Sequence, residues 1–212
     1  MRRMIAIGLV LALAAVVSGC SIGSANFSAL GVKELRIGMT SEAEAVQLFG
    51  EPFSRQSRGT AVESEIIRWL YGKANVGWSG GKLKRLDIEF VDGVANGYIF
   101  NNSLDEDTAT DFDLGLRDSL TAGRANISDA KRLLGSPHGE IKLPSNLLAY
   151  LFAPMPEIIP PEGCTRAFTY NYYMPKEKEG TLAMYLKLLI IFTDETGGIA
   201  LSANNSETVS HG

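Results

Sequence analysis

The stretch IGMTSEAEAVQLFGEP, residues 37–52, decides the fold of this chain because it returns as AGRANISDAKRLLGSP at residues 122–137. Glycine, alanine, leucine and proline recur in both stretches at the same spacing, displaced by 85 positions. Because the displacement is constant over the whole stretch, the sequence predicts a tandem duplication of one small domain. The matched pairs are Phe27 and Phe112, Leu35 and Leu120, Gly38 and Gly123, Ala45 and Ala130, Leu48 and Leu133, Gly50 and Gly135, and Pro52 and Pro137.

Each stretch carries the start and stop signals of a short helix. Ser41 and Glu44 have the S-x-x-E form of a capping box, and Asn126 and Asp129 hold the equivalent places in the second copy. Apolar residues follow at helical spacing, and a glycine with a proline two residues later ends each helix. A second short helix is expected upstream, at residues 27–35 and 112–120.

The remainder of each copy has the period-two pattern of β-strands. In residues 85–90 charged and apolar side chains alternate, which predicts a strand with one solvent-facing side. Residues 186–192 are nearly apolar throughout, so the second side of that strand is expected to be covered by the other copy or by a loop. Strands are predicted at residues 66–71, 83–90, 94–100, 167–174, 182–192 and 199–202.

The predicted fold class is α+β, with two tandem ααβββ units, each a helical hairpin packed on a small antiparallel sheet. Within the strands the copies match at larger displacements, Tyr71 with Tyr170 and Ile88 with Ile190, and Phe168 stands where the first copy has Trp69. The sequence leaves open whether the two sheets join. The expected boundaries are 27–103 for the first unit, 104–111 for an acidic linker, 112–202 for the second unit with an enlarged loop at 138–167, and 203–212 for a polar tail.

The first 20 residues have the pattern of a bacterial export signal. Two arginines precede an apolar run at residues 4–17, which is shorter than the span of about 20 residues that a membrane helix needs. The ending Val17-Ser18-Gly19-Cys20 resembles the lipobox of bacterial lipoproteins, in which the cysteine is lipidated, and Ser21 then favours sorting to the outer membrane. The alternative is an ordinary secretory signal with a chance cysteine. The lipoprotein interpretation gives a signal peptide at 1–19 and a lipidated tether at 20–26.

Several short motifs, taken in order, resemble one protein family. They are Ile37-Gly38-Met39-Thr40, Leu48-Phe49-Gly50-Glu51-Pro52, Trp69-Leu70-Tyr71, Leu86-Asp87-Ile88-Glu89-Phe90 and Asp92-Gly93. Together they are similar to the SmpA/OmlA (BamE-like) outer-membrane lipoprotein domain, and the second copy is a degenerate version. The two-copy layout also resembles the β-lactamase inhibitor protein, which presents a broad concave sheet to an enzyme. The first resemblance implies an outer-membrane lipoprotein facing the periplasm, with envelope proteins such as the barrel-assembly machinery as partners.

Composition and motifs favour binding over catalysis. Without the signal peptide, 18 basic and 24 acidic residues give a net charge of −6, which does not favour a nucleic-acid partner. Besides Cys20 the chain has one cysteine, Cys164, and two histidines, His138 and His211, at no spacing typical of a metal site or an activated nucleophile. His138 is expected in a solvated turn, and no cofactor is expected. We therefore predict a non-catalytic, lipid-anchored binding or scaffolding protein. The alternatives are an inhibitor or modulator of an envelope enzyme, and an enzyme that uses Cys164.

Two regions are candidates for partner contact. The enlarged loop carries an apolar run with Tyr150, Leu151 and Phe152 and a proline-rich exit. The alternative is that this loop is a flap that covers the apolar strand of its own copy. The second candidate is the side of the sheet opposite the helices, where aromatic anchors are expected, although aromatic residues favour strands in any case. These anchors are Trp78, Tyr98, Tyr172 and Tyr173.

Overall fold

The computed structural model describes residues 21–73, 82–104, 112–120, 122–148, 159–178 and 181–210. The first half contains β1 (Ser21–Gly23), the 3-10 helix η1 (Ala29–Glu34), α2 (Glu42–Phe49), β2 (Ser54–Arg58), β3 (Ser64–Lys73), β4 (Lys82–Val91) and β5 (Val94–Asn102). The second half contains the 3-10 helix η2 (Leu114–Ser119), α3 (Ile127–Leu134), β6 (Gly139–Lys142), β7 (Arg166–Lys178), β8 (Thr181–Thr193) and β9 (Ile199–Ser210).

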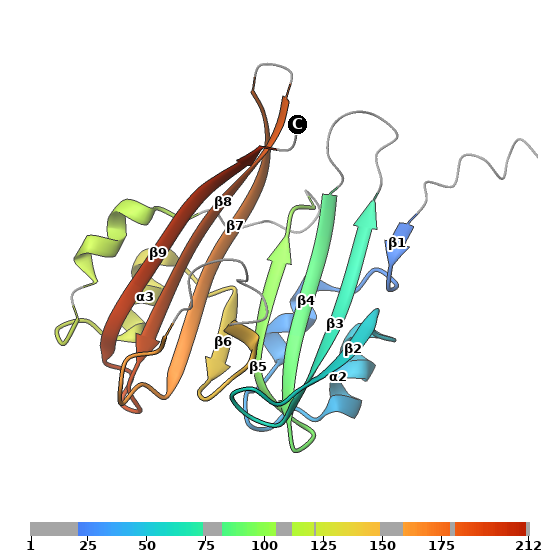
Figure 1. Cartoon of the computed structure of the whole chain (residues 1–212), viewed down its shortest axis with the longest axis horizontal. Helices are drawn as coiled ribbons and strands as arrows, with labels where there is room; N and C mark the ends of the chain where they lie inside the picture. Colours follow the sequence, from blue (N-terminus) through green and yellow to red (C-terminus); the bar gives the residue numbers. More distant parts are fainter. Residues whose placement is uncertain are drawn as a thin grey trace, which may run out of the picture.

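These strands form one antiparallel nine-stranded sheet in the order β1-β3-β4-β5-β6-β7-β8-β9, with β2 also paired to β3 (Figure 1). The halves join at β5 and β6, where Gly97 pairs with Ile141 and Ile99 with Gly139. This joint requires glycine, because a Cβ on Gly139 would lie 2.6 Å from the carbonyl oxygen of Tyr98 and one on Gly97 would lie 2.9 Å from the Cα of Ile141. The sheets of the two halves therefore join into one.

The prediction of two ααβββ units is wrong. One continuous sheet dominates the structure, and each half adds a strand, β2 or β6, directly after its α-helix. The first helix of each half is a six-residue 3-10 helix rather than an α-helix. The predicted strands are confirmed, but β9 continues through most of the predicted polar tail and β6 lies inside the predicted loop. A duplicated sequence shows which elements recur, whereas strand pairing at the junction depends on backbone contacts between the copies.

Both predicted capping boxes are confirmed. The amide of Ser41 donates to the Glu44 carboxylate at 2.7 Å, and the Ser41 hydroxyl accepts from the Glu44 amide at 3.3 Å. Asn126 and Asp129 exchange the equivalent bonds at the start of α3. The glycines that end the two helices have φ values of 76° and 84°, which glycine adopts at no steric cost. Local signals therefore fix both helices.

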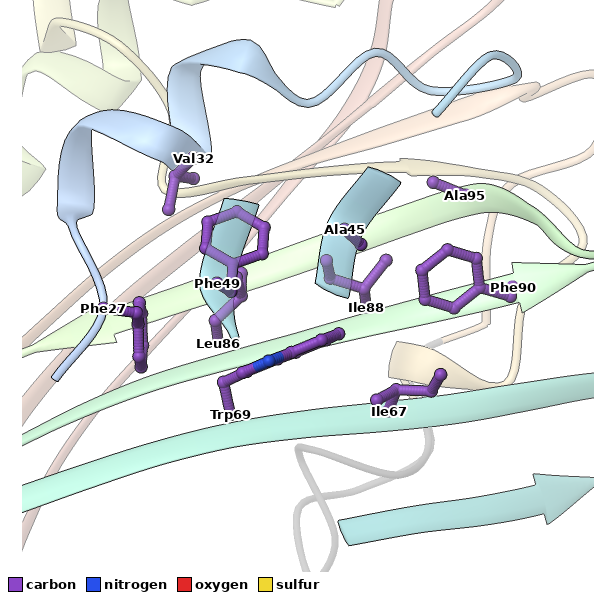
Figure 2. Close-up of a cluster of buried hydrophobic side chains, with 10 residues drawn as sticks. All are labelled: Phe27, Val32, Ala45, Phe49, Ile67, Trp69, Leu86, Ile88, Phe90 and Ala95. Atoms are coloured by element: carbon purple, nitrogen blue, oxygen red, sulfur yellow. The ribbon is translucent and has the colours of Figure 1, made fainter. Parts of the chain in front are cut away.

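Each α-helix covers an apolar cluster on the same side of the sheet. In the first half the fully buried Trp69 lies under Phe49, with 5.6 Å between ring centroids, and Phe27 closes one end of the cluster (Figure 2). In the second half Phe112 and Tyr170 are paired at 5.8 Å. Burial of these rings holds the helices on the sheet.

Equivalent hydrogen bonds in the two halves show which strand positions correspond. The Nζ of Lys84 in β4 donates to the carbonyl of Phe27 at 2.7 Å, and the Nζ of Lys187 in β8 donates to the carbonyl of Phe112 at 3.3 Å. These bonds relate β4 to β8 by 103 positions. The β-bulges support the same displacement. The β4–β5 ladder shifts its register at Glu89/Phe90 and the β8–β9 ladder at Phe192/Thr193, which are again 103 positions apart.

This register differs from the predicted one. The Trp69 indole donates to the carbonyl of the glycine that ends α2 at 2.7 Å, and the Tyr170 hydroxyl donates to the corresponding glycine after α3 at 3.2 Å. Tyr170 therefore takes the place of Trp69, and the predicted match of Tyr71 with Tyr170 is wrong. The match of Ile88 with Ile190 is also wrong, because Ile88 faces the helices and Ile190 faces the opposite side of the sheet.

Candidate functional site

The side of the sheet away from the helices is covered at its centre by residues 143–148, here named the flap. Leu147 and Leu148 of the flap are 0% and 4% exposed and belong to an apolar cluster built by both halves. In the described part of the enlarged loop the flap alternative is therefore confirmed, and the flap covers both halves instead of one. Its partners in this cluster are Ile66, Ile99, Ile141, Ala167, Leu188, Ile190 and Phe192.

A fully buried carboxylate, Glu89, holds the flap on the first half. Its Oε1 accepts from the Asn146 amide at 2.8 Å and from the Ser64 hydroxyl at 2.9 Å. Its Oε2 accepts from the Asn96 side chain at 3.1 Å and from the hydroxyl of Ser145. Four donors from three parts of the chain thus offset the cost of burying this charge.

The next charged side chain on the same face of β4 is Asp87, which is also fully buried. One of its oxygens accepts from the Nε of Arg68 at 2.8 Å, and the other accepts from the Nε of Arg85. The predicted solvent-facing side of this strand is therefore wrong. Alternation identified the two faces, but the charged face is buried because each charge has a partner within the fold.

A groove of about 400 Å³ opens beside the flap and contains Cys164. Cys164 is a free thiol, half-buried against the flap-side cluster. Burial, and secondarily the charge of Asp194, raise the pKa of this thiol, so it stays protonated near neutral pH. The groove is largely apolar. Besides Cys164 it is lined by Ala61, Leu143, Pro144, Ser145, Pro160 and Pro161.

His138 lies at the junction of the halves instead of in the solvated turn that was predicted. Its ring is 6.5 Å from that of Phe112 and 6.3 Å from that of Tyr170, and its Nδ1 accepts from the amide of Asn171 at 2.9 Å. Burial lowers the pKa of this imidazole. Because Cys164 packs on the opposite side of the sheet, the structure does not bring the thiol and the imidazole together.

Two of the four predicted aromatic anchors lie on the helix side of the sheet instead of on the opposite side. Tyr98 and Tyr172 are partly buried and pack against the helix-side clusters. Burial, followed by the charge of Glu140, raises the pKa of Tyr98 to about 12. Tyr173 pairs with Leu186 in the ladder of β7 and β8. The candidates Cys20, Trp78, Tyr150, Leu151 and Phe152 lie outside the described residues.

Among the side chains that the structure describes, the most exposed large apolar ones lie elsewhere. Leu30 in η1 is 68% exposed, Met39 in the turn before α2 is 67% exposed, and Phe53 just after α2 is 51% exposed. Leu30 and Met39 belong to the helical layer of the first half, and Phe53 lies between α2 and β2, where its amide donates to the carbonyl of Arg68 in β3. Ile159 beside the groove is 71% exposed. Comparison of the two copies could have found the first three, because the positions displaced by 85 hold Gly115, Arg124 and His138.

The chain matches no protein-family model, no curated protein and no solved structure. Within the described ranges, no helix is long and apolar enough to cross a membrane. Histidine, cysteine and acidic side chains in that same part of the chain form no group that could hold a metal ion. The site must therefore be interpreted from its own geometry.

Proposed function

We propose that this chain is a non-catalytic, lipid-anchored periplasmic protein of the bacterial outer membrane that binds or scaffolds another envelope protein. The signal-like segment ending at Cys20 supports the anchor. A sheet that spans both halves supports a scaffolding role, because it joins the anchor side to the distant β9 edge through continuous main-chain pairing.

The observation that carries the binding proposal is that exposed positions of the first half hold large apolar side chains, whereas the duplicated positions of the second half do not. Leu30, Met39 and Phe53 are exposed in the first half, and the duplicated positions in the second half hold no large aliphatic side chain. Their apolar surface contributes little to the core of the chain itself. An exposed apolar patch is typical of a surface that another protein covers, and these exposed side chains on the first half are the candidates for such a patch.

The buried polar groups support the same proposal. Glu89 binds the flap, Asp87 binds two arginines, and His138 accepts a main-chain bond at the junction. These groups serve the fold, which favours a structural role for them over a chemical one. Exposed apolar contacts then become the main candidates for recognition.

Envelope proteins, the barrel-assembly machinery among them, are the partners that the family resemblance suggests. A second candidate function is inhibition or modulation of an envelope enzyme, favoured by the continuous sheet that the two copies build together. The flap occupies the centre of the sheet face that such an inhibitor would present. We therefore favour the helical layer of the first half as the contact surface.

Crosslinking in growing cells tests this proposal. The full chain carries a C-terminal tag, and its crosslinked partners are identified by mass spectrometry. We expect Leu30→Glu combined with Met39→Glu to abolish the crosslink to the main partner, while Ile159→Glu, the matched control on the flap side, leaves it intact. Recovery of barrel-assembly subunits supports the scaffolding role. An enzyme that loses activity on stoichiometric binding supports the second candidate, and a crosslink unaffected by the double variant contradicts the helical surface.

A further inference from the structure

The sheet ends at β9, which has a partner strand on one side only among the described residues. β9 pairs with β8 along its length, from Thr193 with Ile199 to Ala183 with Ser210. It is the last strand in the sheet order, and Figure 1 shows it as the outermost strand beside β8. The main-chain groups on its other side are a template for a further strand.

The hydrogen bonds show which residues of β9 present these groups. The carbonyl of Thr193 accepts from the amide of Thr165, so Thr193 bonds toward β7 and its neighbour Phe192 bonds toward β9. Main-chain groups of successive residues in a strand point to alternate sides, so Leu201, the partner of Phe192, bonds toward β8. From there the main-chain groups of every second residue point outward, at Ser202, Asn204, Ser206, Thr208 and Ser210.

The beginning of β9 is already covered from outside. The amide of Ile199 donates to the carbonyl of Ala125 at 3.0 Å, and its carbonyl accepts from the amide of Gly123 at 2.9 Å. These bonds come from the turn before α3, which precedes the outward-pointing residues of β9 in the ladder. In the described part of the chain, β8 is the one strand that pairs with the remainder of β9.

The opposite edge of the sheet is protected, and the difference is informative. It is divided between two short strands, since β1 pairs with residues 71–73 and β2 pairs with residues 64–68. β1 lies in the segment predicted as a lipidated tether, so residues 21–23 are part of the sheet and that prediction is wrong for them. β2 has the polar sequence SRQSR, and its Arg55 is bound to Glu42. Short edge strands and charged edge residues prevent sheets from pairing with each other.

β9 has none of these protective features. Its sequence, IALSANNSETVS, contains no proline and no basic residue, and Glu207 is its one charged residue. It is 12 residues long, about twice the usual length of a strand. The register shift at Phe192/Thr193 lies at its beginning and leaves the outward-pointing part regular. The sequence and pairing of β9 therefore favour the addition of another strand.

A second copy of this chain fits this edge. The chain is acidic overall, with a formal net charge of −4, whereas β9 is nearly uncharged, so two copies approach there with little repulsion. An antiparallel pairing centred on Ser206 uses every outward-pointing residue, because Ser202 then pairs with Ser210 of the second copy and Asn204 with Thr208. In this register Glu207 lies opposite an asparagine, which avoids the cost of like charges placed opposite each other.

We propose that two copies of this chain join through β9 into one continuous sheet, with an antiparallel β9–β9 contact on a two-fold axis perpendicular to the sheet. Such an axis keeps the helix-side clusters of both copies on the same side of the joined sheet. It also places the first halves at the two outer ends, so the exposed Leu30 and Met39 lie outside the joint. The contact uses main-chain groups, so it depends neither on the lipid anchor nor on the partner of the proposed function.

Analytical ultracentrifugation of the full chain in mild detergent tests the association. We expect a dimer, and Asn204→Pro should weaken it because proline removes an outward-pointing N–H and is tolerated on a free strand edge. The dissociation constant should rise by roughly tenfold or more, since the two-fold axis removes the bond twice. Asn204→Ala, the matched control, keeps the N–H and should leave the dimer intact. A monomeric unaltered chain overturns the proposal, as do equal dissociation constants of the two variants with unchanged circular dichroism.

A disulfide test does not depend on the proline variant. In a chain with Cys164→Ser, two copies of Ser206→Cys face each other across the axis at about 5.5 Å between Cα atoms, which a disulfide spans. In the matched control, Ser202→Cys, the two cysteines are roughly 26 Å apart. Mild oxidation should crosslink the first variant into a covalent dimer and leave the second uncrosslinked, and Cys20 is common to both. Equal crosslinking of the two variants overturns the β9 contact.

Discussion

The two halves of this protein agree on one side of the sheet and differ on the other. On the helix side, a lysine and an aromatic donor bind the same carbonyl groups in both halves. On the flap side, the first half has Asp87 and Glu89 where the second half has Ile190 and Phe192. All four side chains are at most 1% exposed. Equivalent positions in one sheet therefore accept buried charges in one half and a hydrocarbon core in the other.

The flap explains how buried charges in the first half and an apolar core in the second half share one face of the sheet. Its polar residues Ser145 and Asn146 bind Glu89 of the first half, and its leucines complete the apolar cluster shared with the second half. The repeated helix side is thus the scaffold of each half. The divergent flap side is what makes the two halves one body.

The largest effect is expected from Asp87→Ile, which gives the first half the residue of the second. The change leaves two guanidinium groups, 22% and 28% exposed, without their shared carboxylate. Removing one partner of a buried ion pair costs about 3 to 5 kcal/mol. The free energy of unfolding, measured with urea by circular dichroism, should fall by about that amount.

A transplant of the whole cluster separates charge from packing. Asp87→Ile combined with Arg68→Thr and Arg85→Leu installs the residues found at the equivalent positions of the second half. Because an apolar replacement of a complete buried cluster is often nearly neutral, this triple variant should recover most of the lost stability. A triple variant no more stable than Asp87→Ile would show that the two flap-side solutions are not interchangeable.

A somewhat smaller loss is expected from Leu147→Ala, which acts on the feature that the two halves share. Leu147 is fully buried in the flap-side cluster, and truncation of such a leucine costs about 3 kcal/mol. Because residues of both halves line the cluster, unfolding should remain a single transition with a lower midpoint. The exposed Ile159→Ala serves as the control and should change stability by less than about 0.5 kcal/mol. Two separate transitions in the Leu147→Ala variant would contradict the shared core.

The third prediction concerns the side on which the halves agree. Tyr170→Phe removes the bond from the hydroxyl to the carbonyl of Gly135 and should cost about 1 kcal/mol. Trp69→Phe should cost more, because it removes both the corresponding bond and part of a fully buried ring. Tyr172→Phe is the matched control on the same face. If Tyr172→Phe lowered the free energy of unfolding as much as Tyr170→Phe does, the bonds of Tyr170 and Trp69 to the helix-ending glycines would not be equivalent.

Sequence patterns were sufficient where the cause of a structure is local. The capping residues Ser41 and Asn126 and the alternating strands have their determinants within a few positions, and these predictions are confirmed. The second side of β8 was expected to be covered by a loop or by the other copy, and both cover it. These features follow from periodicity and helix capping alone.

The remaining features depend on distant partners. Glu89 was expected to face solvent because its partner Asn146 lies 57 positions away and within a loop. Tyr98 was expected opposite the helices, whereas it packs against the helix-side cluster. The match of Tyr71 with Tyr170 was wrong because the copies were aligned by residue identity, whereas the hydrogen bonds define their register. The candidate contact surface was missed for a related reason. Its signal is apolar residues present in only one copy, such as Met39, which is not aromatic.

The smallest effect concerns His138, whose counterpart at the same position in the first half is the exposed Phe53. Burial lowers the pKa of His138 below its ordinary value of 6.5. The unfolded chain therefore takes up a proton before the folded chain does. Stability is fully present above about pH 6.5 and is lost as the pH falls through the lowered pKa of the folded state. Unfolding of the unaltered chain should become easier from about pH 7 to about pH 5.

His138→Phe tests this difference between the halves, because it places the residue of the first half at the junction. The variant loses the acceptor for the Asn171 amide, which is a loss of stability that does not depend on pH. It also loses the titrating group, so its stability should fall less between neutral and mildly acidic pH than that of the unaltered chain. The carboxylates with lowered pKa values, Glu44, Asp129 and Asp194, are present in both chains and cancel in this comparison. If the two chains have parallel pH profiles, His138 takes up its proton equally in the folded and unfolded states, and the junction is as open to water as the corresponding place beside Phe53.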